Sequence, residues 1–139
     1  MITNTTELRV RYSETDQMGR VYYANYLVYF EVARSTLMRG HWKPYAELED
    51  EGYFLPVLEA KCSYYHPVGY DDLIRIEAKL TLPRPTIMHF DYILIDVKRS
   101  RIIAEGFTEH CFMSREGKPR RIPPELHQLI NKNPDNPNG

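Results

Sequence analysis

The sequence predicts an α+β fold in which a curved antiparallel sheet wraps around one long helix. Within residues 23–38, apolar side chains recur at spacings of four, three and four, which places them on one face of a helix about four turns long. After residue 53 the chain is mostly strand-like, with apolar runs, apolar and polar alternation, and short polar turns. One long helix followed by a run of consecutive strands indicates an α+β layout.

The first half of the chain is expected to hold one strand and two helices. Residues 7–12 alternate well enough for a first strand, and the polar turn 13–20 follows. The recurring apolar positions of the long helix are Tyr26, Phe30, Ala33 and Leu37. Aromatic and aliphatic residues continue around much of its circumference, which predicts burial on more than one side. Gly40 is expected to end this helix, and Pro44 suits the first turn of a short acidic helix that closes at Gly52.

The second half is expected to supply the rest of the sheet. Residues 54–66 are rich in β-branched and aromatic side chains, and residues 72–82 alternate plainly. The apolar face of the alternating strand consists of Ile74, Ile76, Ala78, Leu80 and Leu82. Residues 86–98 and 101–114 are predicted to form a hairpin of two long strands. Two consecutive prolines suit the first turn of a short helix over residues 125–130.

Length, composition and charge restrict the class of protein. A chain of 139 residues with 42% hydrophobic residues suits one domain, expected over residues 1–131. The polar tail, residues 132–139, has nothing to bury and is expected to be disordered. The 18 basic and 19 acidic residues give a formal net charge of -1, which favours neither nucleic acid nor an anionic membrane surface. With two cysteines, no apolar run near ~20 residues and no signal-like opening, we expect a cytoplasmic protein without membrane insertion.

The most informative stretch is SETDQMGRVYYANYLVYF, residues 13–30, in which an acidic turn directly precedes the aromatic-rich helix. The first N–H groups of a helix lack partners within it and carry partial positive charge. A helix that starts near Tyr23 could therefore stabilise the oxyanion that forms on an ester or thioester carbonyl under attack. Asp16, in a turn made compact by Gly19, could attack that carbonyl or activate water, and Glu14 is a competing carboxylate. An Asx-turn or a helix cap is the alternative explanation for Asp16.

These residues resemble the signature of the 4-hydroxybenzoyl-coenzyme A thioesterase family, which includes YbgC-like acyl-coenzyme A thioesterases and has the hot-dog fold. The signature joins an acid-Thr-Asp-x-x-Gly turn to a Val-Tyr-aromatic-x-Asn-Tyr helix start and to an Arg further along the helix. The similarity continues in the same order through PVGYDDLIRIEAKL, through FDYILI with IIAEGFTEHCFM, and through REGKPRRIPPEL. It covers residues 8–130.

The resemblance implies an assembly and a catalytic site. Hot-dog proteins join their sheets as dimers and often assemble further, so a homodimer and a homotetramer are expected, with the active site at the dimer interface. Asp16 matches the family's catalytic carboxylate, acting as nucleophile or as general base. The backbone amide of Tyr23 matches the donor that polarises the thioester carbonyl. Many members carry His at this position, and because a phenol is a poor base near neutral pH, Tyr23 is assigned a backbone role.

The implied substrate is an acyl-coenzyme A (acyl-CoA) ester, hydrolysed to a free acid and CoA without a separate cofactor. The acyl group, aliphatic or aromatic, is expected to contact Tyr22, Tyr26 and Phe30. The CoA phosphates require a local basic patch, for which the candidates are Arg84, Lys118, Arg120 and Arg121. The five histidines are scattered and form no close ligand pair, so no metal site is expected. The alternative function is a non-catalytic protein that binds or senses acyl-CoA with the same fold.

Overall fold

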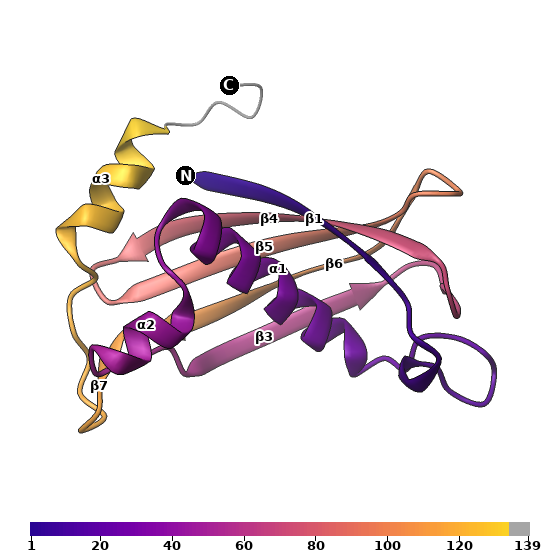
Figure 1. The fold of residues 1–139 in the computed structure, drawn as a ribbon, viewed down its shortest axis with the longest axis horizontal. Coiled ribbons are helices and arrows are strands. Elements are labelled where there is room, and N and C mark those ends of the chain that lie inside the picture. The colour runs from indigo at the N-terminus through magenta and orange to yellow at the C-terminus, as the bar shows by residue number, and fades with distance from the viewer. Residues whose placement is uncertain (134–139) are drawn as a thin grey trace.

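The computed structural model describes residues 1–133, and Figure 1 shows how their helices and strands are arranged. In chain order, the elements are β1 (Ile2–Arg9), the 3-10 turn η1 (Tyr12–Glu14), α1 (Asn25–His41), α2 (Tyr45–Asp50), β2 (Tyr53–Phe54), β3 (Val57–Tyr64), β4 (Leu73–Arg84), β5 (Ile87–Asp96), β6 (Arg101–Cys111), β7 (Met113–Ser114) and α3 (Pro124–Lys132). Of the tail expected to be disordered, Lys132 ends α3, and residues 134–139 lie outside the described residues.

Five strands form the main sheet in the order β1-β4-β5-β6-β3, and every neighbouring pair is antiparallel. The long helix α1 lies across one face of this sheet (Figure 1). Strands β2 and β7 form a separate two-stranded sheet near the end where α2 lies. This arrangement confirms the predicted α+β class and the predicted hairpin of β5 and β6.

The core lies between α1 and the covered face of the sheet. The predicted alternation of β4 is confirmed, because Ile74, Ile76, Ala78 and Leu80 are buried while the side chains between them are partly or fully exposed. Phe30 of α1 is fully buried and stacks on Tyr92 of β5, with ring centroids 4.2 Å apart. The core residues of α1 are Tyr26, Tyr29, Phe30, Ala33, Leu37 and Met38.

The prediction that α1 is buried on more than one side is wrong for the single chain. Leu27, Val28 and Val32 are 42%, 45% and 38% exposed, so the helix keeps an uncovered apolar surface. The helix also begins and ends later than expected, and Gly40 lies inside its last turn. Within residues 1–133, none of the helices combines the length and apolar character that crossing a membrane requires.

Strand boundaries differ from the predictions where pairing between distant segments decides them. Strand β1 begins at Ile2, because the polar residues 3–6 pair along β4 from Ile2↔Leu80 onwards. The strand predicted over residues 54–66 is divided into β2 and β3 before Val57. Strand β4 continues through Pro83 to Arg84, where the register with β5 shifts, and such irregular positions tolerate proline.

Candidate active site

The loop between β1 and α1 carries the acidic motif, and hydrogen bonds close it onto itself. Thr15 and Val21 pair as an isolated antiparallel bridge. The amide of Asp16 donates to the carbonyl oxygen of Arg20 at 2.7 Å, and the amide of Gly19 donates to the carbonyl oxygen of Asp16 at 3.0 Å. Gly19 has a φ of 77°, in the left-handed region that favours glycine. The turn that was expected to be compact is therefore a tight, internally bonded loop.

Asp16 uses one carboxylate oxygen within this loop. Its Oδ1 accepts hydrogen bonds from the amide of Met18 at 2.8 Å and from the amide of Arg20 at 3.3 Å. The predicted Asx-type turn is therefore present. No donor within residues 1–133 hydrogen bonds to Oδ2, and the side chain is only half-buried. The local role of Asp16 thus leaves one carboxylate oxygen available for chemistry.

The start of α1 presents unused backbone donors. The helix begins at Asn25, and two bonds between residues three positions apart tighten its first turn. The Asn25 amide donates to the Tyr22 carbonyl at 2.9 Å, and the Tyr26 amide donates to the Tyr23 carbonyl at 3.3 Å. Among residues 1–133, the amides of Tyr23 and Ala24 find no acceptor. The helix dipole adds positive potential at this end. These amides are suited to an anionic or polarised oxygen.

Glu14, the competing carboxylate, has a different environment from Asp16. The residue is buried, at 8% exposure, and its two carboxylate oxygens accept hydrogen bonds from Arg11 and Tyr29. Both oxygens are therefore engaged inside the protein, which leaves Asp16 as the carboxylate with a free oxygen in this loop.

Tyr64 is a residue of the site region that the sequence analysis missed. Its hydroxyl, on strand β3, donates to the carbonyl oxygen of Tyr23 at 3.0 Å. This bond holds the residue whose amide has no acceptor among residues 1–133. Partial burial, together with the neighbouring Cys62, raises the pKa of Tyr64 to about 12, which keeps the phenol protonated as a donor. No local pattern could have found this contact, because 41 residues separate the two partners.

The three aromatic residues expected to line an acyl pocket lie at different depths. Tyr22 is 46% exposed, and its ring lies 4.7 Å from that of Tyr23. Tyr26 is buried and packs edge-on against Tyr64, with centroids 4.9 Å apart. Phe30 lies fully inside the core. In the single chain, Tyr22 alone among the three presents its ring to solvent.

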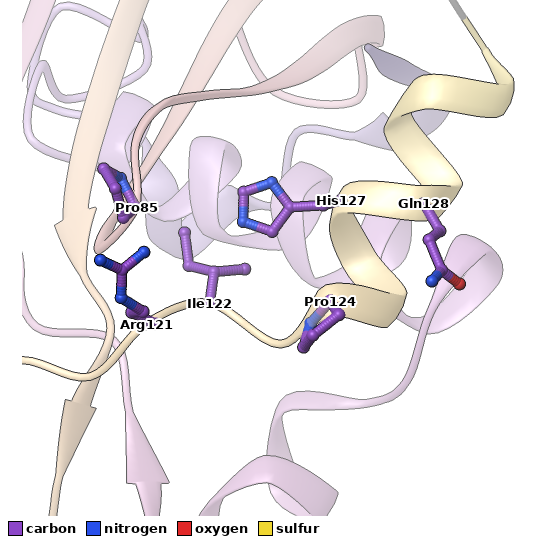
Figure 2. Close-up of a pocket in the computed structure, with 6 residues that line it drawn as sticks. All are labelled: Pro85, Arg121, Ile122, Pro124, His127 and Gln128. Carbon is purple, nitrogen blue, oxygen red and sulfur yellow. The ribbon is translucent and has the colours of Figure 1, made fainter.

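The four cations expected to bind CoA are all exposed, and two of them lie on adjoining segments. The amide of Ile122 donates to the carbonyl oxygen of Pro85 at 2.8 Å, which places Arg121 beside the β4–β5 turn that begins at Arg84. A surface pocket of about 460 Å³ lies here, lined by Pro85, Arg121, Ile122, Pro124, His127 and Gln128 (Figure 2). In that view the His127 ring points towards Ile122, whereas Gln128 points away.

The structure does not bring these cations to Asp16 within one chain. Figure 1 places the loop between β1 and α1 at one end of the sheet, and the β4–β5 turn, β7 and α3 at the other. A site that uses both Asp16 and the cations therefore needs groups from opposite ends of the molecule. Within residues 1–133, no cluster of three or more His, Cys, Asp and Glu side chains is arranged to hold a metal ion.

A long helix packed on a five-stranded antiparallel sheet is the architecture of the hot-dog class of thioesterase-like proteins. The chain belongs to the thioesterase-like superfamily, whose family model matches residues 10–130. The resemblance seen in the sequence is confirmed by this match.

Several relatives share nearly the full length of the chain. A protein of Aquifex aeolicus (strain VF5) is 34% identical over 122 residues, which are 88% of this chain and 93% of that protein. The acyl-CoA thioester hydrolase YbgC of Escherichia coli O6:H1 is 28% identical over 119 residues, 86% of this chain and 89% of YbgC. A DHNA-CoA thioesterase structure from Staphylococcus aureus has a TM-score of 0.88 and 27% identity, covering 95% of this chain and 91% of that one. Homologues of the chain thus include acyl-CoA thioester hydrolases.

Proposed function

We propose that this protein hydrolyses the thioester of a small acyl-CoA, aliphatic or aromatic, to the free acid and CoA. One observation carries the proposal. A single closed loop holds the Asp16 carboxylate and leads into the helix start at Tyr23 and Ala24. Within residues 1–133, one oxygen of that carboxylate and the amides of these two residues have no hydrogen-bond partner. A carboxylate and oxyanion donors are the two groups that attack on a carbonyl requires. Kinship with acyl-CoA thioester hydrolases supports the choice of substrate class.

Two mechanisms are open to these groups. In both, the thioester carbonyl oxygen accepts the Tyr23 N–H, which stabilises the negative charge of the tetrahedral intermediate. In the first, an Asp16 oxygen attacks the carbonyl carbon, the C–S bond breaks and CoA leaves as thiolate. Water then hydrolyses the resulting anhydride, which restores the Asp16 carboxylate and releases the free acid and a proton that the thiolate takes up. In the second, Asp16 removes a proton from a water molecule while the water oxygen attacks the carbonyl carbon. That proton then passes to the sulfur as the C–S bond breaks. Both yield one acid and one thiol for each water consumed.

We also propose that a second copy of the chain completes the site. Within the described residues, β3 pairs with β6 alone, so its other edge is unpaired. Exposed apolar side chains lie along β3 and directly after it, namely Val57, Leu58, Tyr64 and Tyr65. Tyr23, to which Tyr64 hydrogen bonds, is exposed as well. An unpaired strand edge with exposed apolar side chains favours association. Joining two β3 edges would produce a homodimer with one continuous sheet.

Antiparallel pairing of the two β3 strands would also bring the cations to the carboxylate. Such pairing turns the second copy end for end, so its β4–β5 turn approaches the β1–α1 loop of the first. The phosphates of CoA would then contact the cations of the second copy, Arg84, Lys118, Arg120 and Arg121, while the thioester lies at Asp16. The acyl group would contact Tyr22, with Tyr26 and Phe30 behind it. Further pairing into a homotetramer and a cytoplasmic location stay predictions.

Release of CoA thiol from short, long and aromatic acyl-CoA esters tests the function. We expect the wild type to hydrolyse at least one ester and Asp16→Asn to lose about 10²- to 10⁴-fold in rate, the usual effect of losing a catalytic base. The asparagine keeps an oxygen for the Met18 and Arg20 amides, so the loop should stay folded. Asp50→Asn, on the exposed end of α2, is the matched control and should keep full activity.

Two outcomes would contradict the proposal. Near wild-type turnover by Asp16→Asn would show that Asp16 is not the reacting carboxylate. Tight saturable binding of the esters without any turnover by the wild type would instead support the non-catalytic acyl-CoA-binding alternative.

A further inference from the structure

Glu14 places a carboxylate inside the protein, two residues before Asp16. Its Oε1 accepts hydrogen bonds from the Arg11 amide at 2.8 Å and from the Tyr29 hydroxyl at 2.9 Å. Its Oε2 accepts from Nε and Nη2 of Arg11, both at 3.2 Å. Burying a carboxylate is unfavourable unless hydrogen bonds replace its water, and here four donors do so. The arrangement therefore ties the end of β1 to the buried face of α1.

The backbone of Glu14 makes a second set of contacts. Its carbonyl oxygen accepts hydrogen bonds from the Tyr22 amide at 2.8 Å and from Nδ2 of Asn25 at 2.9 Å. Tyr22 ends the closed loop, and Asn25 is the first residue of α1. Glu14 therefore holds the far end of the loop and the helix start with its backbone, and the next turn of the helix with its side chain.

These anchors flank both groups of the proposed site. One residue, Thr15, separates Glu14 from Asp16, and Tyr23 directly follows the anchored Tyr22. None of the hydrogen bonds of Glu14 involves the Asp16 carboxylate, which bonds to Met18 and Arg20 instead. The geometric influence of Glu14 on Asp16 therefore passes through the short backbone segment that joins them.

We propose that Glu14 is a positioning residue, which clamps the Asp16 loop onto α1 through Tyr29 and so sets the Asp16 carboxylate relative to the Tyr23 amide. This inference rests on the proposed function. Burial and the hydrogen bond to Glu14 raise the pKa of Tyr29, so its phenol stays protonated and continues to donate. Misplacing a reacting group by about 1 Å can lower a rate by about 100-fold, so such a clamp matters for catalysis.

Steady-state kinetics on three variants test the positioning role. In Glu14→Gln an NH₂ group replaces one acceptor oxygen, and Tyr29→Phe removes one donor to the same carboxylate. We expect Glu14→Gln to lower kcat by about 10- to 100-fold with little change in KM, because CoA binding is assigned elsewhere. Tyr29→Phe should lower kcat by a smaller factor. The kcat of the double variant should be no lower than that of Glu14→Gln, since both changes act on one contact. Glu7→Gln, on the surface of β1, is the control and should be unchanged.

Hydrogen exchange supplies a readout that does not depend on turnover. In Glu14→Gln, the amides of residues 15–24 should exchange faster while those of β4, β5 and β6 keep their protection, because the clamp is local. Unchanged exchange in the loop, equal loss of protection throughout the molecule, or unchanged kcat in Glu14→Gln would each overturn the inference. If the wild type hydrolyses no ester, the proposed function fails, whereas the exchange comparison still decides whether Glu14 holds the loop.

Discussion

Two carboxylates in one short motif have opposite surroundings in this protein. From the sequence alone, Glu14 and Asp16 are equally good candidates for the reacting carboxylate, because both are acidic and both precede the same helix. In the structure Glu14 is enclosed and bonded to Arg11 and Tyr29, whereas Asp16 is half-buried with Oδ2 unbonded among the described residues. The choice of Asp16 as the reacting residue stays a prediction, and the environment of Glu14 supports it.

His89 is a residue whose surroundings predict a pH dependence of the stability of the fold. On the uncovered face of the sheet, its Nδ1 lies 2.8 Å from Glu109 Oε2 and its Nε2 lies 3.1 Å from Asp91 Oδ1. Its ring also stacks on Phe107, with centroids 5.2 Å apart. Partial burial lowers the pKa of His89, but the two carboxylates outweigh burial and raise it above 6.5.

A folded-state pKa above the unfolded value means that protonated His89 stabilises the fold. The contribution is complete below pH 6.5 and is lost as the pH rises through the raised pKa. We therefore expect the free energy of unfolding of the wild type, minus that of His89→Gln, to stay constant below pH 6.5 and to fall as the pH rises above it. Urea denaturation at several pH values measures this difference. His66→Gln, at an exposed position, is the control, and a pH-independent difference for His89→Gln would refute the expectation.

At the element scale, the packing of α1 on the sheet depends on one glycine of β6. A Cβ on Gly106 would lie 2.8 Å from the Phe30 ring and would also collide with the Lys61 carbonyl of β3. The missing side chain thus lets Phe30 reach Tyr92 beneath the helix. No local sequence pattern predicts this contact, because the glycine and its helix partner lie 76 positions apart.

Gly106→Ala and Gly40→Ala form a matched pair of substitutions. We expect Gly106→Ala to reduce the free energy of unfolding by about 1–3 kcal/mol through overpacking. Gly40 lies inside α1 with nothing within 4 Å of an added Cβ, so Gly40→Ala should raise stability by about 0.4–1 kcal/mol. Urea denaturation of both variants measures the two changes. Wild-type stability of Gly106→Ala would mean that β6 and α1 separate more readily than their packing indicates.

At the scale of the whole molecule, the distance between the acidic loop and the cations leads to a complementation test. If each site combines Asp16 of one copy with Arg120 and Arg121 of another, Asp16→Asn and the double variant Arg120→Ala/Arg121→Ala should be inactive or weak alone. Refolding an equal mixture should restore about one quarter of wild-type activity, because half of random dimers are mixed and each contains one intact site. Thiol release before and after joint refolding measures the recovery.

A site formed within one chain predicts a different result. The site of every chain in the mixture would then carry one of the two defects, and joint refolding would restore no activity. Sedimentation of the wild type and of Leu58→Asp supplies the control, because a charge on the exposed β3 edge should dissociate the dimer without disturbing the core. A monomeric wild type would contradict the shared site directly.

The sequence by itself determined the order of the elements, the buried alternation of β4, the β5–β6 hairpin and the acidic turn before the long helix. Periodicity and turn residues act over a few positions, so a sequence can encode them locally. Only the tertiary structure decided that β3 lies at the sheet edge, that β1 extends to Ile2, that Glu14 is enclosed, and that the cations lie far from Asp16. These features depend on which distant segments become neighbours, and that choice follows from the packing of the whole chain and not from any local pattern.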